Sequence, residues 1–345
     1  MYQADALDES LECFADRGPE FDGGLSNHGP MVVDALVRLG KGPAALPWAV
    51  EYRQRLAEAP TSRWPIDGNG WPEALGDMHR AGDWVAFFEH QLTDSDYHQV
   101  AGLWAPRLLP GLMAAATHGA IRTFHAVRSL GEHSSELRIH ELARALGYWA
   151  ASYRPLPGDP RPLGRSAVQS AAMRLSAMAP KSLAPGRITD RMQCLGETPE
   201  FASIVAEIAP ASDIEVGFSV LTEIGARAYL SNASHAAIAL VHAVTAPAAV
   251  RGLLPLLTPP EQHLALAYAW QAVAGLIATH APAGVPREVV APLPQKRDVI
   301  INQAVASGDA HAIKLTEAAL REDGLISRPA YLLAAADAVV RLARD

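Results

Sequence analysis

Apolar residues recur at helical spacing along nearly all of this 345-residue chain, and alanine and leucine are the most frequent of them. Runs that alternate β-branched and polar residues, as half-buried strands do, are nearly absent. Proline and glycine divide the helical stretches, as at Pro155–Gly158 and Pro259–Pro260. Hydrophobic residues make up 49% of the chain and charged residues 19%, so a large core can form. We therefore predict an all-α fold.

Two stretches of the chain share one histidine pattern. Residues 116–128 and 233–245 are identical at seven of thirteen aligned positions. Each stretch carries two histidines seven residues apart, which are His118 and His125 in the first and His235 and His242 in the second. Seven residues at about 100° each return almost to the starting direction. We therefore expect both imidazoles of each pair to face the core.

The similarity continues beyond these stretches, because an alanine-rich helix with aromatic residues follows each of them. We interpret the two regions, about 105–160 and 222–280, as a duplicated helical layer. The remaining helices are expected to pack around this layer in a single large helical domain over residues 1–345. An array of short repeats is disfavoured, because only two copies are visible and their period is long.

Imidazoles brought together from different helices can form a metal site or transfer protons. His118 and His125 would lie about 10.5 Å apart along one helix axis, so a single ion would take one ligand from that helix. Equivalence between the repeats pairs His118 with His235, or His125 with His242. We favour the second pair, because polar residues follow both of its members three positions later. The alternative is that these histidines are hydrogen-bonded core residues.

His28 lies where a loop leads into a predicted helix. Asn27 can cap this helix, and Pro30 suits its first turn. A histidine held at the start of a helix can reach into a cavity. The alternative is an ordinary histidine on a surface loop.

His311 and Lys314 are three residues apart and therefore neighbours on one helix face. A buried, neutral lysine can ligate a metal, and its amine can also add carbon dioxide to become an anionic carbamate. The alternative is a solvated lysine paired with Glu317. Arg122 shares the face of His118, where it can bind a substrate oxyanion or form a structural ion pair.

Charge and cysteine content limit the classes of partner. The formal net charge is −8 and no stripe of Lys and Arg is present, which disfavours nucleic acid and anionic membranes as partners. Cys13 and Cys194 are isolated, and the N-terminal residues lack an apolar leader, so we expect a cytoplasmic protein. No dinucleotide-binding or P-loop motif is present, so a built-in nucleotide site is not predicted.

Several of these segments occur together, in the same order, in a known family. The chain resembles the questin oxidase-like family in the segments at 25–31, 81–88, 106–111, 116–122, 125–128, 148–153, 242–245 and 311–314. The Thr-His-Gly-x-Ile-Arg block that begins at Thr117 is the most specific of them. The resemblance runs from near residue 20 to near residue 320.

This resemblance implies oxygen-dependent oxygenation or ring cleavage, Baeyer–Villiger-like, of an aromatic polyketide or quinone-type substrate. It also implies a mononuclear non-haem Fe(II) site with four histidines and a carboxylated lysine, and NADPH as an external reductant. Carried onto this chain, the ligands are His28, His242, His311, Lys314 and either His125 or His118. We favour His125 as the fourth histidine, which leaves His118 and Arg122 as catalytic residues.

The expected partners are a small aromatic substrate and dioxygen. A flat substrate pocket would have aromatic walls, for which the candidates are Phe124, Tyr148, Trp149, Tyr153 and Trp270. Two other classes of protein remain open on the same residues. One is a zinc-type, metal-dependent hydrolase that works without oxygen. The other is a non-catalytic helical binding protein whose histidines are simply buried.

Overall fold

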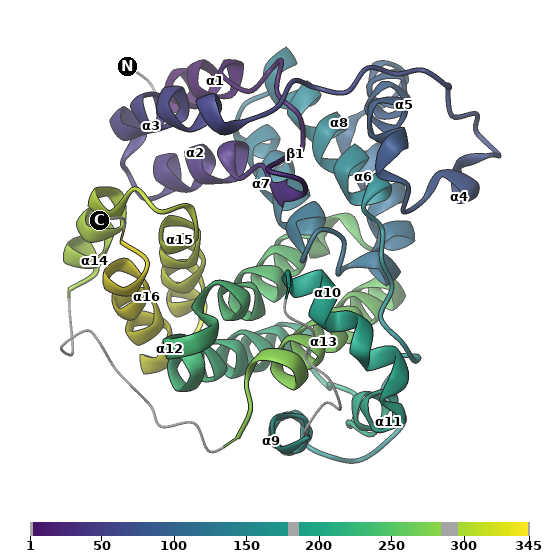
Figure 1. Ribbon diagram of the computed structural model, residues 1–345, viewed down its shortest axis with the longest axis vertical. Coiled ribbons are helices and arrows are strands. Elements are labelled where there is room, and N and C mark those ends of the chain that lie inside the picture. The colour runs from purple at the N-terminus through teal and green to yellow at the C-terminus, as the bar shows by residue number, and fades with distance from the viewer. Residues whose placement is uncertain (1–2, 179–185, 284–295, 344–345) are drawn as a thin grey trace. The chain divides into compact units, whose positions relative to one another are not determined.

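The computed structural model describes residues 3–178, 186–283 and 296–343, and it confirms the all-α prediction (Figure 1). In these ranges the only sheet is an antiparallel pair of two-residue strands, β1 Glu20–Phe21 and β2 Leu25–Ser26. The chain divides into two compact units. The first unit comprises residues 1–154 and 255–257, and the second comprises 155–254 and 258–345. Each of the two similar regions lies mainly in one unit, and the single domain stays a prediction.

The first unit is built around α8, against which α5 and α7 pack. A second group consists of the N-terminal helices α1, α2 and α3, and α2 joins it to α7. Trp84, Phe88 and Trp104 are almost completely buried and contact one another edge-on or stacked. The helices of this unit are α1 Gln3–Glu12, α2 Gly29–Arg38, α3 Ala45–Tyr52, α4 Trp71–Ala74, α5 Ala81–Asp94, α6 Tyr97–Leu108, α7 His118–Glu132 and α8 Glu136–Ala151.

The second unit is organised by its longest helix, α12, which packs along α13 and also contacts α15 and α16 (Figure 1). Alanines at many of the buried positions allow these helices to approach closely. The helices of this unit are α9 Val168–Ala177, α10 Ile188–Met192, α11 Pro199–Ala206, α12 Ile214–Leu253, α13 Pro259–His280, α14 Arg297–Ser307, α15 Ala310–Leu325 and α16 Pro329–Arg341.

Helix α12 is a hairpin of two helical halves. Ala236 leaves the helical conformation, with φ −140° and ψ 27°, and the chain reverses there. A Cβ atom on Gly225 would lie 2.1 Å from the carbonyl oxygen of Ala243, so only glycine permits this close approach of the halves. At the open end, the Arg251 Nε donates to a Glu215 carboxylate oxygen at 2.7 Å.

This hairpin corrects the prediction that His235 and His242 share a core-facing stripe. The reversal at Ala236 falls directly after His235 and breaks the seven-residue periodicity. His235 is exposed, whereas His242 is only 1% exposed. The other predicted pair, His118 and His125, is buried on one uninterrupted helix.

The backbone directly before α7 is not helical throughout. Residues 109–111 form a short 3₁₀ helix, and a turn follows it before α7 begins at His118. Ala115, Ala116 and Thr117 have φ values of 47°, 55° and 73°. This left-handed conformation costs a non-glycine residue about 1–2 kcal/mol. The histidine at the start of α7 is therefore presented by three consecutive strained residues.

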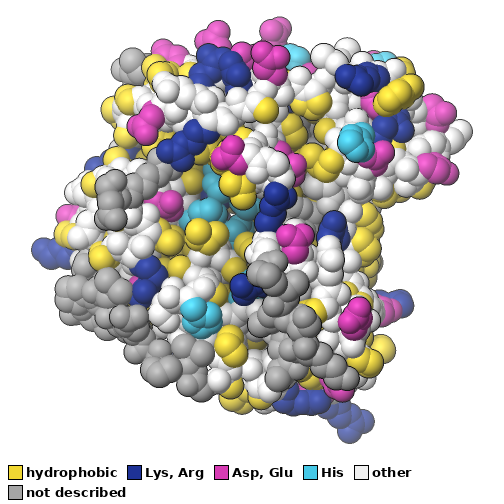
Figure 2. All heavy atoms as spheres, viewed as in Figure 1, with side chains coloured by type: hydrophobic (Ala, Val, Ile, Leu, Met, Phe, Trp, Pro, Cys, Tyr) yellow, Lys and Arg dark blue, Asp and Glu magenta, His cyan; other side chains and the backbone are white. Residues whose placement is uncertain are grey.

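The surface carries both signs of charge. On the face drawn in Figure 2, Lys and Arg side chains are interspersed with Asp and Glu side chains. The segment 214–256 is long and apolar enough to cross a membrane, but 83% of its most apolar stretch is buried within the structure. The core helix of a soluble protein has these same properties. The exclusion of nucleic acid and membrane partners stays a prediction.

The strained turn before α7 predicts that glycine at position 116 is stabilising. We expect Ala116→Gly to raise the free energy of unfolding by about 1 kcal/mol, because glycine adopts positive φ without the Cβ clash. The control, Ala120→Gly in the buried interior of α7, should lower it by about 1 kcal/mol. Urea unfolding measures the free energy of unfolding of both variants. Equal destabilisation by the two changes would show that the turn before α7 is not strained.

Candidate functional site

His28 is fixed at the N-terminus of α2 by its neighbours. The residue before the helix is His28, so Asn27 is not its N-cap as predicted, but the side-chain oxygen of Asn27 accepts a hydrogen bond from the Gly29 amide at 2.9 Å. The Asn27 amide donates to the carbonyl of Gly18 at 3.0 Å, and the His28 amide donates to the Tyr52 hydroxyl at 2.9 Å. His28 is half-buried, and the backbone amides of His28 and of the next residue are both hydrogen-bonded.

His118 lies beside His28. Their rings stack with centroids 4.7 Å apart and planes inclined by 18°, and their ring nitrogens approach within 4.8 Å. The Nδ1 of His118 is 2.7 Å from the carbonyl oxygen of Ala115, in the strained turn. A carbonyl only accepts hydrogen bonds, so Nδ1 carries the proton and the lone pair lies on Nε2. His118 therefore has the tautomer that a metal ligand needs.

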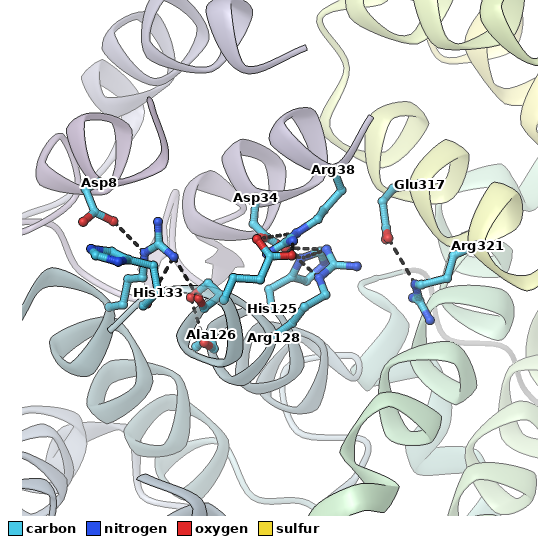
Figure 3. Close-up of polar contacts among 12 residues, drawn as sticks. Asp8, Asp34, Arg38, His125, Ala126, Arg128, His133, Glu317 and Arg321 are labelled. Atoms are coloured by element: carbon cyan, nitrogen blue, oxygen red, sulfur yellow. Dashed lines mark hydrogen bonds and ion pairs between the residues drawn. The ribbon is translucent and has the colours of Figure 1, made fainter. Parts of the chain in front are cut away.

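His125 lies in a cluster of charged residues (Figure 3). Its Nδ1 is 2.7 Å from a carboxylate oxygen of Asp34, which α2 provides. The same carboxylate accepts from Arg128, and its other oxygen accepts from the Arg38 Nε at 3.2 Å. Burial alone would raise the pKa of Asp34, but Arg128 and His125 more than offset this, and the pKa is well below its usual range.

In the second unit, His242 and His311 come together from α12 and α15. Their ring centroids are 5.6 Å apart in an edge-to-face arrangement. The Nδ1 of His242 is 2.8 Å from the carbonyl oxygen of Ile238, which again leaves the lone pair on Nε2. Burial and then the charge of Lys314 lower the pKa of His242 to about 3, and they lower that of His311 too. Both imidazoles are therefore neutral at physiological pH.

Lys314 lies one turn beyond His311 and is only 2% exposed. The alternative of a solvated lysine is therefore wrong, and Glu317 forms an ion pair with Arg321 at 3.1 Å (Figure 3). Burial lowers the pKa of Lys314 to about 7, against an opposing effect of Asp309. Asp309 caps α15 by accepting from the amides of His311 and Ala312. Near neutral pH, a large share of Lys314 side chains therefore carries a neutral amine.

Arg122 forms a structural ion pair, as one of the two interpretations expected. Its Nε and Nη2 donate to the two carboxylate oxygens of Glu141 at 2.6 and 2.7 Å, in a buried bidentate contact. Arg122 also lines a cavity of the first unit, together with Tyr148.

The other aromatic residues expected around a substrate have partners within their own units. The indole of Trp149 donates to the Gly111 carbonyl, and that of Trp270 donates to the Val205 carbonyl. The ring of Tyr153 lies against Gly111. The ring of Phe124 lies beneath the Arg128 guanidinium. Of the five candidates, Tyr148 has the position that a pocket residue would need.

The residue that the sequence interpretation missed is Asp34. Carboxylates are sparse near the histidines in sequence, but α2 supplies this one from 91 residues away. Its signal was present in the segment Met31–Val37, where Asp34 is the single charged residue in an apolar helix. A buried carboxylate of this kind requires cationic partners.

The structure brings the predicted residues together in two groups. In the first unit the histidine pair consists of His28 and His118, and His125 is bound to Asp34. The second unit joins His242, His311 and Lys314. The geometry therefore favours His118 over His125 as the partner of His28.

Comparison with known proteins identifies the family. A model of the Questin oxidase-like family matches residues 25–319, so the chain belongs to this family, as its sequence motifs predicted. No curated protein matches the chain. Membership of this family indicates an oxidoreductase that acts on polyketide-type substrates.

The contacts of Asp34 lead us to predict that removing its negative charge strongly destabilises the protein. Asp34→Asn should lower the free energy of unfolding by about 3–5 kcal/mol, because the buried cations around it lose their counter-charge. The control, Asp94→Asn, changes a carboxylate whose side chain is 65% exposed, and it should have an effect within about 0.5 kcal/mol. Similar effects of both changes in urea unfolding would contradict the role of Asp34.

Lys314 predicts a pH dependence in protein stripped of metal. Its pKa is about 7 in the folded state and near 10.4 when unfolded, so the unfolded state binds more protons between these values. The free energy of unfolding should therefore rise from pH 7 to pH 10, and Lys314→Met should lose this share of the rise. Identical pH profiles of the two proteins would show that the lysine is not desolvated.

Proposed function

We propose that this protein is a non-haem, iron-dependent oxygenase that uses dioxygen to oxygenate or cleave an aromatic polyketide or quinone-type substrate. Membership of the Questin oxidase-like family supports the redox class and the type of substrate. The observation that carries the metal proposal is the group formed by the buried His242 and Lys314 and the half-buried His311. These three side chains have lowered pKa values and offer neutral nitrogen donors in a helical interior.

We propose His28, His118, His242, His311 and Lys314 as the iron ligands. The donor chemistry fits Fe(II), which accepts imidazole nitrogen together with anionic oxygen. His118 and His242 each donate Nδ1–H to a backbone carbonyl, which fixes the ring and increases its basicity at Nε2. These hydrogen bonds support His118 as the fourth histidine in place of the expected His125.

Lys314 would supply the anionic oxygen as a carbamate. In this step the lone pair of the neutral amine forms a bond to the carbon of carbon dioxide, and the nitrogen then loses a proton to water. The lowered pKa of Lys314 makes this neutral amine available near pH 7. A protonated lysine at the same position would repel a metal cation.

The proposed ligands would hold an iron ion that would supply the redox chemistry needed to activate dioxygen. Insertion of one oxygen atom into the substrate reduces the second atom to water, and the two electrons come from NADPH acting as an external reductant. His125 would not ligate the metal in this proposal. Asp34 instead orients its ring and can stabilise the imidazolium form, so that His125 can hold a proton near the reaction.

Metal analysis tests the proposal. Protein purified anaerobically should contain about one iron ion per chain, and its oxygen uptake with a hydroxyanthraquinone and NADPH should depend on that iron. Because they remove ligands, His118→Ala and Lys314→Ala should each lose most of the iron.

The matched control is His125→Ala, which removes an imidazole seven residues from His118 on the same helix. It should keep its iron, although it loses stability. Retention of iron by His118→Ala and its loss from His125→Ala would restore the original assignment. Stoichiometric zinc with oxygen-independent activity would favour a hydrolase, and a wild-type protein that binds neither metal would overturn the proposal.

A further inference from the structure

The first unit contains a cavity of about 300 Å³. Its walls come from the loop after α1, the exposed loop at 59–62, the start of α5 and the middle of α8. This volume lies at the lower end of the range for sites that bind small molecules. The lining combines apolar residues, among them Pro60, Val85 and Ala86, with three arginines.

The arginines of this cavity differ in how their charges are balanced. Arg122 is neutralised by its bidentate contact with Glu141. Arg144 instead donates to two neutral groups, the carbonyls of Phe14 and Ala15. Arg144 is thus a cation whose hydrogen bonds are made to backbone oxygens rather than to a carboxylate.

Arg17 adds a second donor to the same wall. Its Nη2 donates to Asp16 at 3.1 Å, but its buried Nε has no hydrogen-bond partner. The carboxylate in the lining is Glu89, which is 40% exposed and lies 3.1 Å from a ring nitrogen of His140. The lining therefore holds three arginines and one carboxylate, and Arg144 is the arginine whose hydrogen bonds are made to neutral groups.

The charge of Arg144 is poorly stabilised in the absence of a ligand. Burial lowers its pKa and Glu141 opposes this, while the nearby positive charge of Arg122 lowers it further against smaller opposing effects of Glu89 and Asp16. An anion in the cavity would offset both effects. A guanidinium group matches a planar carboxylate through parallel N–H donors. The apolar part of the lining favours a ligand with a hydrocarbon or aromatic body over a bare inorganic anion.

We infer that this cavity binds a small organic monocarboxylate. The carboxylate would face Arg17 and Arg144, and the apolar body would lie against Pro60, Val85 and Ala86. The site requires no metal and does not depend on the proposed oxygenase function. It is tested by binding alone.

Isothermal titration of the full chain with benzoate tests this inference, before and after treatment with a metal chelator. Benzoate should bind in both conditions, and neutral benzamide should bind at least about tenfold more weakly because it lacks the charge. Acetate should also bind more weakly than benzoate, because it cannot cover the apolar wall. Arg144→Gln should weaken benzoate binding by about 10- to 100-fold.

Two further variants distinguish loss of the site from loss of the fold. Ala86→Phe fills the apolar side of the cavity without touching an arginine, and it should also abolish benzoate binding. The control Arg161→Gln removes the same charge from an exposed residue of the second unit and should leave binding unchanged. Circular dichroism confirms that each variant is folded.

Several results would overturn the inference. They are a wild-type protein that does not bind benzoate, equal binding of benzamide, and equal binding of acetate. Unchanged affinity in the folded Arg144→Gln variant or in the folded Ala86→Phe variant would do the same. Benzoate binding that persists after the iron is removed would support the independence of this site from the metal.

Discussion

Alanine-rich helices pack closely, and close packing removes the water that would otherwise solvate the charged side chains that they bury. Each buried charge then needs an opposite charge or several hydrogen bonds at short range. Asp34 satisfies this requirement with the cations of α2 and α7, and Glu322 does so with Arg251 at 2.8 Å in the second unit. The positive charges of Lys314 and Arg144 are less completely balanced by carboxylates. These two residues are also the ones that we propose to contact a metal ion and an organic anion, respectively.

The periodicity of apolar residues was enough to predict the all-α fold and most of the helices. It could not predict the two places where the backbone leaves the helical conformation. The reversal at Ala236 depends on contact between Gly225 and Ala243, which are distant in sequence. The left-handed residues before His118 include two alanines, which normally favour helix. In both places tertiary packing overrides local preference.

The candidate site shows the same division between local and long-range information. The position of His28 at a helix start and the proximity of His311 to Lys314 follow from the local sequence, and both were predicted. The choice between His118 and His125 was not available from spacing, because both lie on one buried face of α7. It depends on Asp34, which reaches His125 from another helix, and on the Ala115 carbonyl. Identical residues at equivalent positions of the two repeats also have different environments, since His235 is exposed and His118 is buried.

Arg144 connects two parts of the first unit that are far apart in sequence. It belongs to α8, but its guanidinium holds the carbonyls of Phe14 and Ala15, directly after the first helix. The same side chain faces the cavity. A ligand that orders this arginine also makes local detachment of the N-terminal helix rarer. By thermodynamic linkage, detachment of this helix lowers the affinity for the ligand by the same factor. Amide hydrogen exchange in residues 6–14 would therefore report the occupancy of a cavity that these residues do not have to touch.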